Sequence, residues 1–186
     1  MKTAIILHGM SDSKEEYDGN EAGHHWIPWL SNELGTQGYV VYTPEMPEPY
    51  EPHYENWCRV FEQFILDEET LLIGHSCGGG FLVRYLSEKD IKVGKVILVA
   101  PWLDPDKDHC PKFFEFTIKR NLVAFTSGVT VFVSKDDDSD ILESVKKIQA
   151  ECDDIQVQEF TDKGHFTLDA MGTREFPELL EVVLKQ

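Results

Sequence analysis

The sequence predicts an α/β fold built on a three-layer, doubly wound and mostly parallel sheet. Six segments have the length and apolar character of strands, and the first five are nearly continuous apolar runs, as in strands covered on both faces. Segments with the helical spacing of apolar residues lie between them. This alternation implies an open sheet with right-handed crossovers. The candidate strands are residues 4–9, 39–44, 70–74, 95–101, 129–134 and 155–160.

Three segments carry apolar side chains along one helical stripe. The helix that contains Leu30 and Leu34 is expected to end at Gly35 or Gly38, because glycine is common just past a helix end. A further helix, outside these three segments, is expected to start at the glycine-rich run 78–80, whose small residues allow close packing against the sheet. The other two stripes are formed by Trp57, Val60, Phe61, Phe64 and Ile65, and by Phe176, Leu179, Leu180 and Val183.

Length and charge limit the classes of function. We expect one domain, residues 1–186, with enough length to bury a good core. No apolar run reaches the roughly 18 residues of a membrane span, and residues 4–7 are expected to form a strand rather than part of a signal peptide. The formal net charge of −17 argues against nucleic acid and anionic lipid surfaces, because binding either requires clustered Lys and Arg. A protein partner is compatible with the sequence, but no motif identifies one.

The cysteines and the acidic run after residue 134 bear on metals. The cysteines lack CxxC spacing, which argues against a zinc site and a dense disulfide framework and favours a reducing cytoplasm. A calcium loop of the DxDxDG type also fails, because Ile141 occupies the glycine position and Lys147 that of the final Glu. We therefore expect no metal and no cofactor. The four cysteines are Cys58, Cys77, Cys110 and Cys152.

Chemistry is expected beyond the carboxyl ends of the strands, where ligands of open α/β sheets bind. Three of the loops at these ends hold a serine, an acid cluster and a histidine. The serine is Ser76, in the sequence GHSCG of residues 74–78. A catalytic serine on a tight strand-to-helix turn needs unusual backbone angles, and glycines two positions to either side avoid a collision across the bend. A phosphate loop is the alternative, but no lysine follows these glycines.

A serine hydroxyl is a weak nucleophile until a base takes its proton, so Ser76 requires a histidine later in the chain. His165 has both the required order and the required position, directly after the last strand. His75 adjoins Ser76, and its side chain is expected to point away from the bend. The remaining histidines precede Ser76 or lie in a polar loop: His8, His24, His25, His53 and His109.

The acid of such a triad is expected in the acidic run after the fifth strand, because the chain order is serine, acid, histidine. Asp140 and Glu143 have the spacing of a helix N-cap and its capping-box partner, and Ser139 is a rival cap. Asp137 has the best register to orient His165 and to stabilise the imidazolium. The candidates left for the catalytic role are Asp136, Asp137 and Asp138.

Two backbone N–H groups are expected to form an oxyanion hole. One comes from Cys77, the residue after the serine, at the start of a helix where amides point outward. The other comes from the loop after the first strand, where Met10 is the first choice and Ser11 the next. The Cys77 thiol itself is expected to be buried and inert.

Five segments, in order along nearly the whole chain, carry a resemblance: HHWIPWLSNEL, MPEPYEPHYENW, DEETLLIGHSCGG followed by RYL, VILV, and FTDKGHF. The chain resembles the retinoblastoma-binding protein 9 family of small α/β-hydrolase serine hydrolases. The resemblance implies an α/β-hydrolase fold without a large cap domain and a triad of Ser76, Asp137 and His165. In that family the acid is the second of an Asp pair, often followed by an apolar residue and a proline. Here SKDD matches and the proline is absent, so Asp138 remains an alternative.

Two aromatic residues are expected near a substrate. Trp102 follows the carboxyl end of a strand, and Phe166 adjoins His165. Residues 110–120 are too few for a cap domain, but a helix there would partly shade the site and restrict it to modest esters or amides. The sequence thus predicts a serine hydrolase that cleaves carboxylic esters, thioesters or amides of small-molecule or short acyl substrates through an acyl-enzyme. The alternative is a non-catalytic interaction module on the same scaffold.

Overall fold

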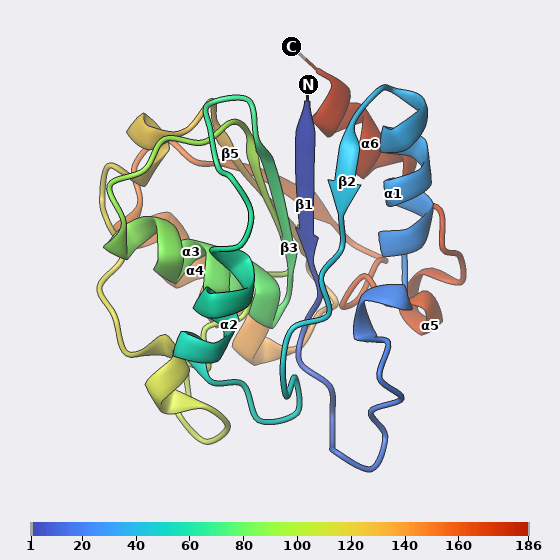
Figure 1. Ribbon diagram of the computed structural model, residues 1–186. Coiled ribbons are helices and arrows are strands. Elements are labelled where there is room, and N and C mark those ends of the chain that lie inside the picture. The colour runs from blue at the N-terminus through green and yellow to red at the C-terminus, as the bar shows by residue number, and fades with distance from the viewer. Residues whose placement is uncertain (1, 186) are drawn as a thin grey trace.

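The computed structural model describes residues 2–185 and contains one six-stranded sheet (Figure 1). The strand order is β2-β1-β3-β4-β5-β6, and every neighbouring pair is parallel. The chain first steps from β1 to one edge, then returns past β1 and adds the other strands in sequence. This is the doubly wound, parallel sheet that the alternation predicted. The strands are β1 (Thr3–Leu7), β2 (Val40–Tyr42), β3 (Leu71–His75), β4 (Val96–Val99), β5 (Val129–Ser134) and β6 (Gln156–Phe160).

Helices cover both faces of the sheet and complete the three layers (Figure 1). One face carries α1 (Ile27–Thr36) and α6 (Pro177–Leu184), which contact each other. The opposite face carries α2 (Tyr54–Phe61), α3 (Cys77–Glu88) and α4 (Ser139–Glu151). The short elements are α5 (Leu168–Met171) and the 3₁₀ helices η1 (Glu21–Gly23), η2 (Pro111–Phe114) and η3 (Leu122–Phe125).

Burial along the strands follows their place in the sheet. The central strands β3, β4 and β5 are buried throughout, as their apolar sequences predicted. The prediction of a two-sided buried strand over residues 39–44 is wrong, because β2 is an edge strand of only three residues. Its last residue, Tyr42, is 43% exposed. Because all neighbouring strands are parallel, the carboxyl ends of the buried strands lie at the same end of the sheet.

Two helix predictions differ from the structure at their ends. The apolar stripe that begins at Trp57 was expected to lie on one helix through Ile65. Helix α2 ends at Phe61 instead, and Ile65 is 86% exposed. The reason is a tightening of the backbone, since the Gln63 N–H donates to the Val60 carbonyl three residues earlier. Helix α1 ends between its two expected glycine stops, at Thr36.

The connection between β4 and β5, residues 100–128, contains no α-helix; its regular elements are η2 and η3. The helical part of residues 110–120 is thus the short 3₁₀ helix η2 rather than an α-helix. Phe113 is buried instead, with its ring 5.1 Å from that of Trp57 and 6.2 Å from that of Phe81. Because these rings belong to the core, the segment does not form a cap over the carboxyl ends of the strands.

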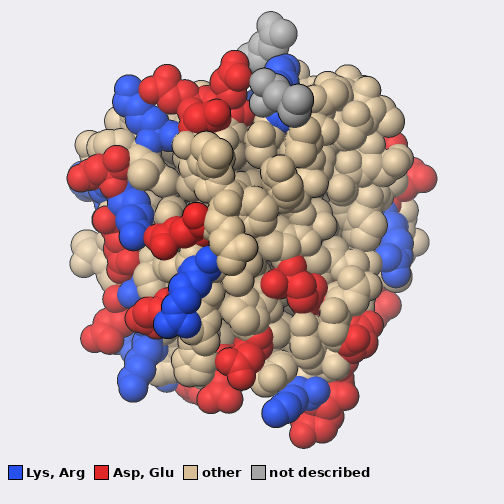
Figure 2. Space-filling view, in the orientation of Figure 1, with Lys and Arg blue, Asp and Glu red and all other residues tan. Residues whose placement is uncertain are grey.

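No helix in the described part of the chain is both long and apolar enough to cross a membrane. Carboxylates are spread over the surface and outnumber the basic side chains on the face in Figure 2. All four cysteines are free thiols, and Cys58, Cys77 and Cys152 are buried.

Candidate active site

Ser76 lies at the bend between β3 and α3 in a strained backbone conformation. Its φ and ψ are 50° and −120°, which few residues other than glycine adopt. The flanking glycines make this bend sterically possible: a Cβ on Gly74 would lie 2.6 Å from the Gly78 carbonyl oxygen. A Cβ on Gly78 would in turn overlap the carbonyl oxygens of Leu7 and His8 at the end of β1. The GxSxG spacing thus lets Ser76 project beyond the sheet while α3 starts close to β1.

Hydrogen bonds to the neighbouring strand hold Ser76 in place. The Ser76 N–H donates to the Val99 carbonyl at the end of β4, at 2.9 Å. The Ser76 carbonyl accepts from the N–H groups of Gly80 and Trp102, at 3.0 and 3.1 Å. With the backbone fixed on both sides, the Cα–Cβ bond of Ser76 keeps one direction relative to the surrounding loops.

His165 and Asp137 form a pair across the loops that follow β6 and β5. The Nδ1 atom of His165 lies 3.1 and 3.2 Å from the two carboxylate oxygens of Asp137. The Asp137 side chain is 1% exposed and that of His165 is 28% exposed. A carboxylate only accepts hydrogen bonds, so the proton of neutral His165 is on Nδ1 and the Nε2 atom is free to act as a base.

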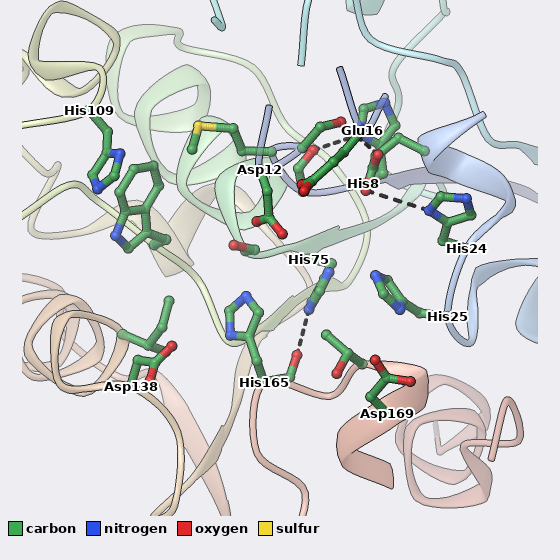
Figure 3. Close-up of a pocket in the computed structure, with 18 of the residues that line it drawn as sticks. His8, Asp12, Glu16, His24, His25, His75, His109, Asp138, His165 and Asp169 are labelled. Carbon is green, nitrogen blue, oxygen red and sulfur yellow. Dashed lines mark hydrogen bonds and ion pairs between the residues drawn. The ribbon is translucent and has the colours of Figure 1, made fainter. Parts of the chain in front are cut away.

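The structure brings Asp137, and not Asp138, against His165. Asp138 is exposed and makes no hydrogen bond to His165, although both residues line the same cavity (Figure 3). No hydrogen bond joins Ser76 Oγ to His165 either; both of these residues lie within the described chain. Catalytic hydrogen bonds are often long in ligand-free enzymes and tighten when substrate binds.

Asp136, the third candidate acid, connects the loop after β5 to the loop after β6, which carries His165. Its carboxylate accepts from the Ser134 hydroxyl and from the Gly164 N–H, the latter at 3.1 Å. The Ser134 hydroxyl oxygen in turn accepts from the Lys163 N–H at 3.0 Å. The hydrogen bond from Ser134 holds the pKa of Asp136 below its usual value. Asp136 therefore fixes the distance between the acid-bearing and histidine-bearing loops.

Helix α4 begins two residues earlier than a cap at Asp140 requires, and one residue earlier than the rival cap at Ser139 requires. Asp138 occupies the N-cap position and Asp140 lies inside the first turn, so the proposed cap at Asp140 is wrong. The Asp140 carboxylate is engaged elsewhere, since it accepts from the indole Nε1–H of Trp102 at 2.7 Å. This contact orients Trp102, which lines the cavity as expected.

The loop after β1 passes directly beside Ser76. A Cβ on Gly9 would lie 3.1 Å from the Cβ of Ser76 and 3.6 Å from its hydroxyl oxygen. Ser11 is unsuited as an oxyanion donor because its N–H donates to the Pro49 carbonyl at 3.2 Å. The N–H of Met10 has no acceptor among residues 2–185 and is free to bind a ligand. The geometry thus favours the first of the two sequence candidates.

His8 holds this loop in position. Its Nε2 atom accepts from the Met46 N–H at 2.8 Å, so the ring proton is on Nδ1, which donates to the Gly9 carbonyl at 2.7 Å. Burial lowers the pKa of His8, against the raising effect of the Gly9 carbonyl and of nearby carboxylates such as Glu45. A neutral imidazole of one tautomer therefore fixes the backbone next to Met10.

A cavity of about 550 Å³ opens over the carboxyl ends of the strands and contains both Ser76 and His165 (Figure 3). Met10 and Trp102 also line it. Within the described chain, its wall contains several histidines and carboxylates and no lysine or arginine. The carboxylates belong to Asp12, Glu16, Glu21, Asp138, Asp140 and Asp169.

Phe166 does not lie at this cavity, which corrects the prediction of a substrate contact. It is fully buried, and its ring stacks on Phe176 at 5.4 Å and meets Phe160 edge-on at 5.6 Å. The positive φ of 54° turns its side chain away from His165 and into the core. The Cys77 thiol is also buried, as expected, and burial raises its pKa well above the usual value.

Two histidines that sequence reasoning set aside lie beside His165. His75 is buried and, against the expectation that it points away, its Nε2 atom lies 2.9 Å from the His165 carbonyl oxygen. His25 packs next to His75, with ring centroids 5.6 Å apart. Adjacency to Ser76 was a signal for His75, but nothing local in the sequence pointed to His25. The acids of the cavity form no cluster suited to a metal ion among the described residues.

Comparison with known proteins assigns the chain to a family. A family model described as serine hydrolase matches residues 4–185. The chain belongs to the serine hydrolase family. The putative hydrolase YdeN of Bacillus subtilis is 26% identical to this serine hydrolase, over 98% of this chain and 94% of YdeN. Serine hydrolase RBBP9 of Rattus norvegicus is 25% identical, over 89% of this chain and 88% of RBBP9. These relatives confirm the resemblance drawn from the sequence motifs.

Solved structures also support the fold of this serine hydrolase. The crystal structure of the ydeN gene product of B. subtilis superposes with a TM-score of 0.81 at 25% identity, covering 98% of this chain and 97% of the other. The serine hydrolase therefore has an α/β-hydrolase fold, and its β4–β5 connection carries no large cap.

Proposed function

We propose that this serine hydrolase cleaves carboxylic esters, thioesters or amides through an acyl-enzyme, with Ser76 as nucleophile, His165 as base and Asp137 as the orienting acid. The observation that carries the proposal is that the buried Asp137 carboxylate contacts Nδ1 of His165, while His165 itself lines the same cavity as the strained Ser76. A buried Asp–His pair alone, or a strained serine alone, is also found where it has a purely structural role. Their meeting over the carboxyl ends of the strands supports a catalytic role.

In the first half of the reaction, Nε2 of His165 takes the hydroxyl proton of Ser76 while Oγ attacks the carbonyl carbon. The oxygen of the tetrahedral intermediate becomes negative, and the N–H groups of Met10 and Cys77 stabilise it. The Asp137 carboxylate stabilises the imidazolium. His165 then gives its proton to the leaving group, and the ester of Ser76 remains.

In the second half, a water molecule gives a proton to Nε2 of His165 and attacks the acyl carbon. Collapse of this second tetrahedral intermediate breaks the bond to Ser76 Oγ, which takes the proton back from His165, and the carboxylic acid leaves. No cofactor or metal enters the scheme. The cavity of about 550 Å³ is suited to a small-molecule or short acyl substrate, and Trp102 is the proposed aromatic contact.

The proposed setting is the cytoplasm, which four free thiols support. A net charge of −17 supports a protein that binds neither nucleic acid nor anionic membranes.

Labelling by a fluorophosphonate probe tests the proposal. The phosphorus atom is attacked by an activated serine, so the wild-type protein should be labelled and Ser76→Ala should not. A known serine hydrolase in the same reaction controls for the probe. Absence of label on the folded wild-type protein would favour the alternative, a non-catalytic interaction module on the same scaffold.

A further inference from the structure

His165 lies between two residues in the left-handed backbone region. Gly164 has a φ of 47° and Phe166 a φ of 54°, and a left-handed conformation is costly for a bulky aromatic residue. The hydrogen bond from the Phe166 N–H to the Lys163 carbonyl closes this turn locally. Such a turn persists only where its surroundings hold it, so contacts from other elements determine where the His165 ring lies.

His75 provides the first of these contacts. Its Nε2–H donates to the His165 carbonyl at 2.9 Å, and the two rings lie 4.9 Å apart (Figure 3). His75 is 3% exposed, with the Trp26 ring 5.9 Å away on another side. A carbonyl accepts only, so the ring proton is on Nε2. Because His75 immediately precedes Ser76, this bond joins the histidine-bearing loop to the serine bend.

His25 provides the second contact, three residues further along the same segment. The Leu168 N–H at the start of α5 donates to Nδ1 of His25, with a separation of 3.2 Å. An N–H donor requires a lone pair, so Nδ1 of His25 carries no proton. His25 itself has a φ of 55°, in the left-handed region where histidine and asparagine are enriched.

The two contacts are complementary, and the contact of His25 requires an uncharged ring because its Nδ1 atom accepts a hydrogen bond. His75 donates to the first residue of segment 165–168, and His25 accepts from the last. Burial lowers the pKa of His75 well below its usual value. Burial, with the neighbouring His24 and His165, lowers the pKa of His25 to about 4. Both imidazoles thus stay neutral at physiological pH and add no positive charge beside His165 as it takes a proton.

We propose that His25 and His75 are positioning residues that hold segment 165–168 from both ends and aim the His165 ring at Ser76. The inference rests on the proposed hydrolase function. It assigns to these histidines no contact with substrate. Their effect is exerted through the backbone of His165, so their loss should lower kcat and leave KM nearly unchanged.

Paired variants separate the hydrogen bonds from the shape of the side chains. His75→Gln keeps a donor at the position of Nε2, whereas His75→Met has a similar length without one. His25→Asn keeps an acceptor at the position of Nδ1, whereas His25→Gly tolerates the positive φ and has no acceptor. The matched control is His53→Met, because His53 is exposed and lies outside the cavity.

The measurements are kcat and KM on p-nitrophenyl acetate, with thermal unfolding of each variant. We expect His75→Met and His25→Gly to lose about 10- to 100-fold in kcat with KM within about twofold, as for a misplaced catalytic group. His75→Gln and His25→Asn should recover most of the loss, and His53→Met should match the wild type.

Two negative results have different meanings. If wild-type turnover survives Ser76→Ala unchanged, the proposed function fails. If turnover depends on Ser76 but folded His75→Met and His25→Gly keep full kcat, or if the Gln and Asn variants lose as much as their partners, the positioning role alone is wrong.

Discussion

Asp137 and Asp138 are neighbours in the chain with opposite environments. The Asp137 side chain is 1% exposed and contacts Nδ1 of His165, whereas Asp138 is exposed at the start of α4. Asp137→Asn should therefore lower kcat by roughly 10³- to 10⁴-fold, because an amide no longer holds the required tautomer or stabilises the imidazolium. Asp138→Asn should stay within about threefold. Steady-state hydrolysis of one ester by both variants makes the comparison.

Equal and near-normal activity of the two variants would contradict either assignment of the acid. A large loss in Asp138→Asn alone would show that the loop rearranges when substrate binds. Far-UV circular dichroism of each variant confirms that the loss is not one of folding.

The position of Ser76 was predictable from local sterics, whereas the contacts that hold His165 were not predictable from the sequence. The GxSxG pattern encodes its own bend, since Gly74 and Gly78 meet across four residues. The contact between His75 and the His165 carbonyl joins positions 90 residues apart, and no local pattern specifies it. The strained φ of Phe166 likewise depends on the aromatic core, which explains why its direction was predicted wrongly.

At the scale of elements, apolar periodicity located the sheet and most helices but not every helix end. The stripe on α2 continues in the sequence through Ile65, yet the backbone tightens after Phe61. The pattern of apolar residues alone does not distinguish a continuing α-helix from a closing 3₁₀ turn. The structure of residues 110–120 was not predictable from apolar residues for a related reason, because buried phenylalanines there belong to a short 3₁₀ helix.

The packing of α3 on β1 gives a prediction about Gly78. Its Cβ would overlap the carbonyl oxygens of Leu7 and His8, and backbone atoms cannot rotate away. Gly78→Ala should lower the free energy of unfolding by about 1–3 kcal/mol, as in overpacked cores. It should also lower kcat, because the displaced loop carries Met10. Urea unfolding monitored by tryptophan fluorescence measures the first effect.

Gly35→Ala is the matched control for this substitution. Gly35 lies in α1, and nothing within 4 Å would contact its new Cβ. Alanine has the higher helix propensity, so this variant should be more stable than the wild type by about 0.5–1 kcal/mol. Unchanged stability of Gly78→Ala would show that α3 and β1 are separated by more than the structure gives.

At the scale of the whole molecule, charge predicts which substrates reach Ser76. The net charge is −17, and the cavity wall has carboxylates and no lysine or arginine. Clefts lined by one sign of charge concentrate ligands of the other sign. Acetylcholine should therefore be cleaved with a kcat/KM about tenfold above that of its uncharged analogue 3,3-dimethylbutyl acetate at low salt. The ratio should fall toward one as salt screens the carboxylates.

Substitutions separate the field of the cavity from the charge of the protein as a whole. Asp12 and Asp169 are exposed at the cavity and have no ion-pair partner in the described chain, so replacing both with Asn should lower the preference for the cation. Replacing Glu69 and Glu151 with Gln removes the same amount of charge at the other end of the sheet from the cavity. Glu69 lies just before the amino end of β3, and Glu151 is the last residue of α4. When the variants are compared at about 0.1 M salt, this control should keep the preference of the wild type, because exposed charges separated by more than the Debye length of about 10 Å are then largely screened. Equal losses in the two double variants would mean that net charge alone attracts the cation, and a preference for an anionic ester would contradict both explanations.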